Sequence, residues 1–233
     1  MNEEEIRQLA RRIDHTCLKA NATEDDLKKL CDEAAAARTA MVAINTEWTS
    51  FCKELLKDTD VHVGAAISFP LGQSGLPVKL AETEYAISQG ADEIDYVIHI
   101  GKAKMHDWDY LENEMSQITD LCHQNQVICK VIFETCYLNE DEIRQLARIA
   151  SKVKPDYIKT STGFGPAGAA VEHVRMMKEE AGPDVRVKAA GGIRDLKAAL
   201  DMIEAGADRI GTSSTLKILA EAQEAGNRLD KNQ

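Results

Sequence analysis

The sequence has no long apolar run, no excess of basic residues and no closely paired cysteines. No apolar stretch approaches the roughly 18 residues that a membrane-spanning helix requires, so we expect no membrane span. The formal net charge of −11 argues against nucleic acid or an anionic membrane surface as the partner, because both attract a basic footprint. It does not argue against a small anionic ligand, because charges beyond about 8 Å are largely screened at physiological salt.

The cysteines and histidines form no recognisable disulfide or metal pattern. The six cysteines are scattered without a C-x-x-C pair, and no secretory leader precedes the acidic residues 3–5, so we expect a reduced, cytoplasmic protein. The six histidines show neither an H-x-x-x-H spacing nor a carboxylate spacing suited to a metal ion. We therefore expect no metal site.

What the sequence does contain is a regular alternation of apolar runs and amphipathic segments. Its 233 residues, 44% of them hydrophobic, are enough for one sizeable core, so we expect one domain over residues 1–233. A short N-terminal helix is expected over residues 3–11. Eight strand-like runs follow, each with a helical segment after it: 13–16, 40–44, 61–67, 93–98, 127–133, 156–160, 185–189 and 208–211.

This strict alternation indicates a parallel sheet, and eight units in about 230 residues favour a (β/α)₈ TIM barrel. The helix expected over 78–89 has Leu80, Tyr85 and Ile87 as its apolar positions. Residues 203–211 resemble residues 87–95, and residue 203 lies 116 positions after residue 87, about half of the chain. The echo fits a duplicated half-barrel and fits a recurrent helix-to-strand turn equally well.

Two lysines near the ends of neighbouring strands are the candidates for chemistry, because reacting groups in this barrel lie at the carboxyl ends of strands. Lys159 ends the sixth strand, and Lys188 lies near the end of the seventh. Alternation along each strand turns both side chains into the barrel. Repulsion of about 3 kcal/mol between charges roughly 5 Å apart, together with desolvation, would leave one lysine substantially neutral near pH 7. A neutral lysine can attack a carbonyl and form a Schiff base.

An aspartate and a third lysine accompany the pair. Asp95 lies within the fourth strand, where it could relay protons through water as a carbinolamine forms and collapses. Lys130 on the fifth strand could point into the barrel beside Asp95, either as a supporting residue or as one half of a structural ion pair. The ordinary alternatives for these residues are a solvated lysine at a strand end and a surface carboxylate.

Glycine- and hydroxyl-rich loops after the last three strands indicate an anion site. Such loops present backbone amides at helix N-termini, and those after the seventh and eighth strands form the usual phosphate site of this barrel. The candidate residues are Thr162, Gly163, Gly191, Gly192, Gly211, Ser213 and Ser214. An amine beside an anion cradle predicts a small phosphorylated carbonyl compound as substrate.

Six motifs in order resemble the deoxyribose-phosphate aldolase family from about residue 13 to residue 219. They are Asp14-His15-Thr16, Phe69-Pro70-Leu71-Gly72, Gly90-Ala91-Asp92-Glu93-Ile94-Asp95, Ile158-Lys159-Thr160-Ser161-Thr162-Gly163, Lys188-Ala189-Ala190-Gly191-Gly192-Ile193-Arg194 and Gly211-Thr212-Ser213-Ser214. The resemblance implies a class I aldolase that reversibly cleaves 2-deoxy-D-ribose 5-phosphate to D-glyceraldehyde 3-phosphate and acetaldehyde. It implies no metal or organic cofactor, and a homodimer or larger homo-oligomer.

The resemblance also implies roles for individual residues. Lys159 matches the Schiff-base lysine, Lys188 the lysine that perturbs it, and Asp95 the proton-relay carboxylate. Asp14 and Thr16 match the substrate pocket, where Asp14 positions substrate hydroxyls.

The sequence departs from the family in several places. Ala43 replaces a common cysteine, and Phe164 stands where some members carry a lysine. Residues 229–233 also lack the tyrosine that some members use in proton transfer, so that step would fall to Asp95, Lys188 and water.

Two other functions remain open from the sequence. One is a Schiff-base aldolase of the same barrel that acts on a different sugar phosphate. The other is a non-catalytic sugar-phosphate sensor, which is disfavoured because a sensor has no need for both lysines.

Overall fold

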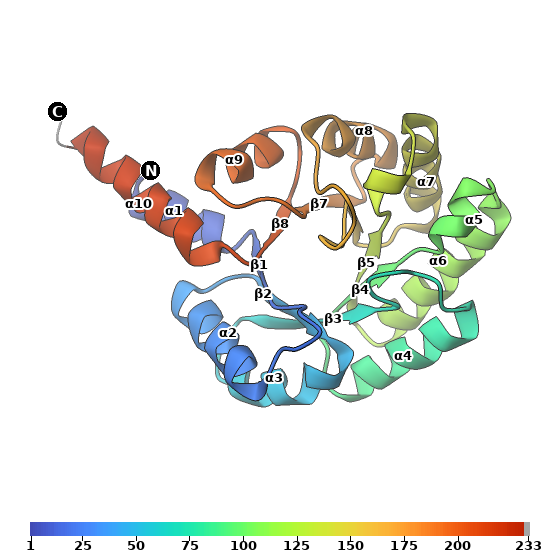
Figure 1. The fold of residues 1–233 in the computed structure, drawn as a ribbon, viewed down its shortest axis with the longest axis horizontal. Helices are drawn as coiled ribbons and strands as arrows, with labels where there is room; N and C mark the ends of the chain where they lie inside the picture. Colours follow the sequence, from blue (N-terminus) through green and yellow to red (C-terminus); the bar gives the residue numbers. More distant parts are fainter. Residues whose placement is uncertain (231–233) are drawn as a thin grey trace.

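Eight parallel strands close into a barrel in chain order in the computed structural model, which describes residues 1–230 (Figure 1). The strands are β1 (Ile13–Thr16), β2 (Met41–Asn45), β3 (His62–Ile67), β4 (Glu93–Val97), β5 (Ile128–Ile132), β6 (Tyr157–Lys159), β7 (Arg186–Ala190) and β8 (Arg209–Thr212). Each strand pairs with its neighbour in parallel, and β8 pairs with β1. The predicted (β/α)₈ barrel is confirmed, and all eight strands lie where the apolar runs placed them.

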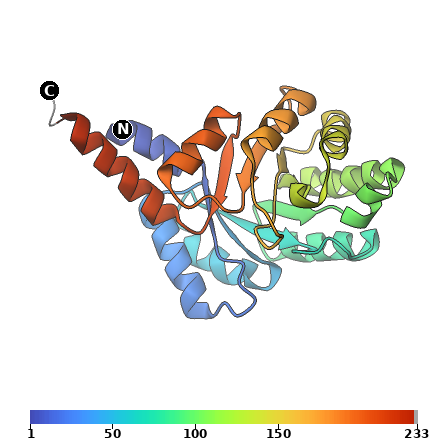
Figure 2. The ribbon, with the colours of Figure 1, turned by 45° about the horizontal axis from the view of Figure 1, so that its top comes forward.

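Helices surround the barrel. They are α1 (Glu3–Ala10), α2 (Glu24–Ala37), α3 (Thr49–Leu56), α4 (Leu76–Ser88), α5 (Ile100–Lys104), α6 (Trp108–Gln124), α7 (Glu140–Val153), α8 (Val171–Ala181), α9 (Leu196–Glu204) and α10 (Thr215–Asp230), with short 3₁₀ turns η1 (Thr46–Trp48) and η2 (Thr135–Tyr137). The long α10 lies beside α1 and reaches away from the barrel (Figure 2). None of the described helices is long and apolar enough to cross a membrane.

Local sequence sets the helix boundaries. Thr23 caps α2 by accepting a hydrogen bond from the Asp26 backbone N–H, and the Asp26 carboxylate accepts one from the Thr23 backbone N–H. Asn139 and Glu142 form the same reciprocal cap on α7. These caps satisfy N–H groups that a helix start leaves unpaired, so each helix begins directly after its strand-end loop.

The predicted buried face of α4 is wrong in part. The side chains buried on this helix are Leu76, Lys79, Thr83 and Ala86. Tyr85, one of the apolar positions named from the sequence, is exposed. Lys79 can occupy the buried face because its amine donates to the Val97 carbonyl at 2.7 Å and pairs with a buried glutamate of α6.

The two faces of the barrel strands differ sharply. Ile158 and Val187 are fully buried in the apolar layer between strands and helices, which supplies most of the hydrophobic stabilisation. Several inward-facing positions carry charged side chains instead. The strand register sets Lys159 opposite Lys188, and Asp95 opposite Lys130. The fold therefore gathers the charged residues inside the barrel.

Candidate active site

Lys159 lies at the carboxyl end of β6 with 3% of its surface exposed. Its amine donates a hydrogen bond to Asp95 Oδ2 at 2.8 Å. Burial lowers the pKa of Lys159 to about 8; the nearby charge of Lys188 acts in the same direction, and that of Asp95 opposes it. From the sequence we expected repulsion between the two lysines to be the main reason for a lowered pKa, but burial is the larger cause.

Asp95 links the three inward lysines. One carboxylate oxygen accepts hydrogen bonds from Lys159 and, at 2.6 Å, from Lys188. The other oxygen accepts from Lys130 at 2.8 Å. Burial alone would raise the pKa of the Asp95 carboxyl, but these three cations hold it well below its ordinary value. Asp95 is therefore an anion at neutral pH, held within hydrogen-bonding distance of the candidate nucleophile.

Beneath Lys159, six charged side chains of alternating sign form a closed ring, which we call the ion ring. Its members, in order of contact, are Asp14, Lys188, Asp95, Lys130, Glu93 and Arg209, which returns to Asp14. They come from β1, β4, β5, β7 and β8, and each residue is less than a tenth exposed. Three carboxylates and three cations make the ring neutral, and Lys159 is attached to it through Asp95.

A cavity of about 370 Å³ opens at the carboxyl ends of the strands, beside β1, β6, β7 and β8. Among the charged residues of the barrel interior described above, only Lys159 lines it. The remaining walls come from the segment after β1, from α2, and from the loops after β6, β7 and β8. A ligand in this cavity therefore meets the amine of Lys159 directly and the ion ring only through that lysine.

Glycine-rich loops form the side of the cavity that lies away from α2. Gly163, Gly191, Gly192, Gly211 and Ser213 all line it. The backbone at Gly191 has a φ of +89°, and a Cβ there would come within 3.0 Å of the Gly168 backbone. Side chains at such positions are strained and crowded, so the loop needs glycine to let its backbone approach a ligand.

Gly211 also makes room within the barrel. A Cβ at this position would come within 2.9 Å of Ala190 Cβ and 3.2 Å of Lys188 Cε. The absence of a side chain therefore leaves the space through which Lys188 reaches Asp95.

Thr162 lines the cavity, but its donors are already engaged. Its backbone N–H donates to the buried Glu134 carboxylate at 3.2 Å, and its hydroxyl donates to the same group. The Thr162 hydroxyl also accepts the backbone N–H of Phe164 at 3.0 Å. Thr162 and Glu134 thus shape the loop that follows Lys159.

Three other residues named from the sequence have distinct positions. Thr16 lines the cavity, and its hydroxyl donates to the Asp14 carbonyl at 2.9 Å. Asp14 is fully buried in the ion ring and does not line the cavity. Ser214 is also absent from the lining, and its backbone N–H donates to Thr212 Oγ1 at 2.9 Å. The last residues of the sequence, where some family members place a tyrosine, lie outside the described part, which ends at residue 230.

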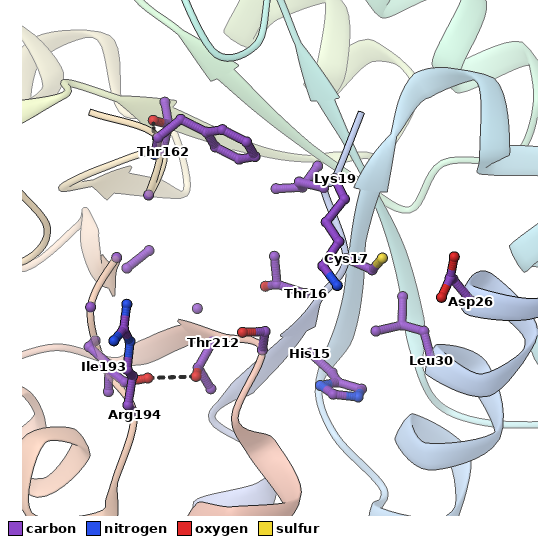
Figure 3. A pocket seen from close by; sticks show the side chains of 18 of the residues that line it. His15, Thr16, Cys17, Lys19, Asp26, Leu30, Thr162, Ile193, Arg194 and Thr212 are labelled. Atoms are coloured by element: carbon purple, nitrogen blue, oxygen red, sulfur yellow. Dashed lines mark hydrogen bonds between the residues drawn. The ribbon is translucent and has the colours of Figure 1, made fainter. Parts of the chain in front are cut away.

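Three basic side chains of the cavity were not singled out from the sequence: Lys19, Lys29 and Arg194. Figure 3 shows Arg194, from the loop after β7, and Lys19, from the segment after β1, on opposite sides of the cavity. The Ile193 carbonyl accepts a hydrogen bond from Thr212 Oγ1 at 2.6 Å, which ties the loops after β7 and β8 together. Arg194 ends a motif noted in the sequence, and its position after a glycine pair was the available signal.

Among residues 1–230, no group of three or more His, Cys, Asp or Glu side chains is placed to hold a metal ion. The carboxylates of the ion ring are instead engaged by lysine and arginine side chains.

Comparison with known proteins assigns the chain to a family. A family model described as DeoC/LacD family aldolase matches residues 9–221. A deoxyribose-phosphate aldolase from Lactobacillus acidophilus is 57% identical over 209 residues, covering 90% of this chain and 88% of the relative. One from Bacteroides thetaiotaomicron is 48% identical, covering 92% and 90%.

A solved structure supports the same assignment. The tetrameric deoxyribose phosphate aldolase from Aeropyrum pernix superposes with a TM-score of 0.87 at 31% identity, covering 97% of this chain and all of that one. With a matching family model over most of its length, close relatives and a shared barrel, this chain belongs to the DeoC/LacD family of aldolases.

Proposed function

We propose that this chain reversibly cleaves 2-deoxy-D-ribose 5-phosphate to D-glyceraldehyde 3-phosphate and acetaldehyde through a Schiff base on Lys159. The observation that carries the proposal is the position of Lys159, a buried amine with a pKa of about 8 at the floor of a cavity rich in glycine loops. Its relatives named deoxyribose-phosphate aldolase support the choice of substrate.

The covalent step follows from the chemistry of a neutral amine. Lys159 Nζ attacks the aldehyde carbon C1 of the open-chain sugar, and loss of water from the carbinolamine gives an iminium ion. Removal of the C3 hydroxyl proton then breaks the C2–C3 bond, and the bonding electrons move towards the iminium nitrogen as an enamine. Glyceraldehyde 3-phosphate leaves, C2 is protonated, and hydrolysis releases acetaldehyde and restores the amine.

Asp95 and Lys188 are the groups placed to support proton transfer. Asp95 Oδ2 lies 2.8 Å from Lys159 Nζ and 2.6 Å from Lys188 Nζ, so a proton lost by the attacking amine has an adjacent acceptor. Because neither group lines the cavity, we assign the exchange with substrate oxygens to water that enters beside Lys159. Lys130 supports Asp95 from the opposite oxygen.

The phosphate is assigned to the loops after β6, β7 and β8. Gly163, Gly191, Gly192, Gly211 and Ser213 bring backbone to the cavity wall, and the loop after β8 leads into the N-terminus of α10. A helix N-terminus and exposed amides favour an anion. Ser214 would contribute from the position directly before α10. Arg194 adds a cation on the same side.

Substrate hydroxyls are assigned to the opposite side of the cavity. Thr16 reaches the cavity directly, whereas Asp14 acts from below by orienting the Thr16 hydroxyl and binding Lys188. Thr162 holds the loop that carries Gly163.

Borohydride trapping tests this function. Wild-type protein incubated with 2-deoxyribose 5-phosphate and borohydride should gain a reduced adduct that peptide mapping locates on Lys159. Lys159→Met should gain none, whereas Lys79→Met, which removes a buried lysine far from the cavity, should label normally. An adduct on another lysine, or none on wild type, would overturn the proposal.

We further propose a homodimer or larger homo-oligomer in a reducing, cytoplasmic setting. The tetrameric relative from Aeropyrum pernix supports the first part, and six free cysteines support the second. Sedimentation equilibrium that gives a 25.7 kDa particle at micromolar concentration would contradict the oligomer.

A further inference from the structure

We infer that Glu93 and Arg209, at the end of the barrel opposite the cavity, are positioning residues that set the protonation of Lys159 through the ion ring, with Arg209 favouring the free amine and Glu93 opposing it. The inference rests on the proposed function, in which Lys159 is the attacking amine. Glu93 begins β4 and Arg209 begins β8, and neither residue lines the cavity. Any effect they have on the reaction must therefore pass through other residues.

The contacts provide an unbroken path from this end to Lys159. Arg209 holds Asp14 with two nitrogens, at 2.7 Å for Nε, and reaches both oxygens of Glu93 at 3.2 and 3.3 Å. Glu93 contacts Lys130 at its other side, and Asp14 lies 2.5 Å from Lys188. Both branches then meet at Asp95. One oxygen of Asp95 is therefore linked to Arg209 through Lys188 and Asp14, and the other is linked to Arg209 through Lys130 and Glu93.

Charge balance shows why this pair matters. The ring contains as many carboxylates as cations, so a protonated Lys159 adds one positive charge that nothing in the ring offsets. Burial makes an unbalanced charge costly in free energy. Of the charged side chains inside the barrel, Lys159 is the one that reaches the cavity and can lose its proton to water there. A neutral ring beneath a buried lysine therefore favours the free amine.

Removing either end residue should unbalance the ring in opposite directions. Without the Glu93 charge, the ring is positive, and the Lys159 ammonium is repelled. Without the Arg209 charge, the ring is negative, and the ammonium is stabilised. At an effective dielectric near 20, a unit charge roughly 10 Å away shifts a pKa by about one unit.

Other charged groups face Lys159 and must stay constant in such a test. Within the barrel they are Asp95 on β4, Lys130 on β5 and Lys188 on β7, and around the cavity they are Lys19, Asp26, Lys29, Glu33 and Arg194. His62, at the start of β3, donates a hydrogen bond from Nδ1 to the Glu93 carboxylate at 2.8 Å. Because the hydrogen bond with Glu93 raises the pKa of this histidine, profiles should also be measured in His62→Gln.

The experiment measures the pKa of Lys159 without substrate, from the pH dependence of its acylation rate followed by peptide mapping. The exposed Lys28 serves as an internal reference. We expect Glu93→Gln to lower the pKa of Lys159 by about one unit and Arg209→Met to raise it by about one unit. The double variant restores neutrality and should return the value to within about 0.3 units of wild type.

Opposite shifts in the two single variants, cancelled in the double variant, support the inference. Shifts of the same sign, or no shift in folded variants, overturn it. Where a single variant does not fold, the double variant remains decisive, because a pKa displaced by a full unit there contradicts charge balance. Failure of the proposed function looks different: wild-type protein would show no trapped imine on Lys159, whatever its pKa.

Discussion

Two buried lysines in this molecule each lie next to a carboxylate, but only one of them is placed to react with a substrate. Lys79 lies between α4 and α6, fully buried, with its amine 2.8 Å from Glu114 Oε1. Lys159 lies inside the barrel, 2.8 Å from Asp95 Oδ2. Burial lowers the pKa of both lysines. A depressed lysine pKa therefore does not by itself identify a reactive amine.

The carboxylate partners mark the first difference. Burial raises the pKa of Glu114, which has a single lysine partner. Burial also opposes ionisation of Asp95, but three lysines overcome it and hold its pKa well below the ordinary value. The charges of Lys79 and Glu114 cancel each other. In the barrel, Lys159 is the cation in excess of a neutral ring.

Access marks the second difference. Lys159 lines the cavity of about 370 Å³, whereas Lys79 lines neither that cavity nor the neighbouring one of about 240 Å³ beside Phe164. The comparison teaches that a reactive lysine needs an unbalanced charge environment and an opening for substrate, in addition to burial.

Exchanging each lysine for methionine should separate activity from stability. We expect Lys159→Met to reduce kcat/KM by at least about 1,000-fold, because the covalent step is lost. Lys79→Met should change kcat/KM less than about twofold but lower the free energy of unfolding by roughly 3 kcal/mol, because it leaves Glu114 buried without its partner. Steady-state kinetics and urea unfolding measure the two effects. A large loss of activity in folded Lys79→Met would break the comparison.

Neutralising each carboxylate should give the next largest contrast. We expect Asp95→Asn to reduce kcat by about 100- to 1,000-fold, because proton transfer loses its acceptor and three cations lose an anion. Glu114→Gln should leave kcat nearly unchanged. Single-turnover rates of imine formation locate the loss in the covalent step. Normal imine formation in Asp95→Asn would contradict the assigned role.

The pH dependence of wild-type activity should follow Lys159. Because its pKa is about 8, the neutral fraction is small at pH 6 and nearly complete at pH 9, so kcat/KM should rise by somewhat less than about 100-fold across this range. The unfolded chain keeps this proton until a higher pH. The contribution of Lys159 to the free energy of unfolding therefore becomes more favourable as pH rises from about 8 to 10.5. A flat kcat/KM profile between pH 6 and 9 would contradict a lowered pKa.

Arg194 should affect binding more than chemistry. We expect Arg194→Met to raise KM for 2-deoxyribose 5-phosphate by about 10- to 50-fold, the loss of one charge-assisted contact, with little change in kcat. The same variant should leave kcat/KM for unphosphorylated 2-deoxyribose within about twofold. Equal losses with both sugars would show that Arg194 does not contact the phosphate.

The sequence was most informative where strand periodicity applied. Alternation along β6 and β7 correctly turned Lys159 and Lys188 into the barrel, and register placed them side by side. The same rule accounts for Asp95 and Lys130. Each of these charged residues is flanked along its strand by apolar residues. The apolar neighbours must pack against the helices, so the charged side chain can only point into the barrel.

Other features depended on contacts between distant segments. Glu93 lies in one of the family motifs and Arg209 in the similar segment at residues 203–211, but their pairing required closure of the barrel between β4 and β8. Glu134 has a left-handed backbone with a φ of +56°, which a non-glycine residue adopts rarely and which no periodicity indicates. Lys79 was missed because a lysine on a helix is ordinarily solvated, and its partner lies on another helix.

The contact between Glu93 and Arg209 also bears on the symmetry of the barrel. The two residues are separated by 116 positions, the spacing of the internal sequence echo, and they occupy equivalent places on diametrically opposed strands. Two identical halves would bring the same side chain to both places, and like charges at this distance would repel. Two copies of the half-barrel must therefore differ at this position.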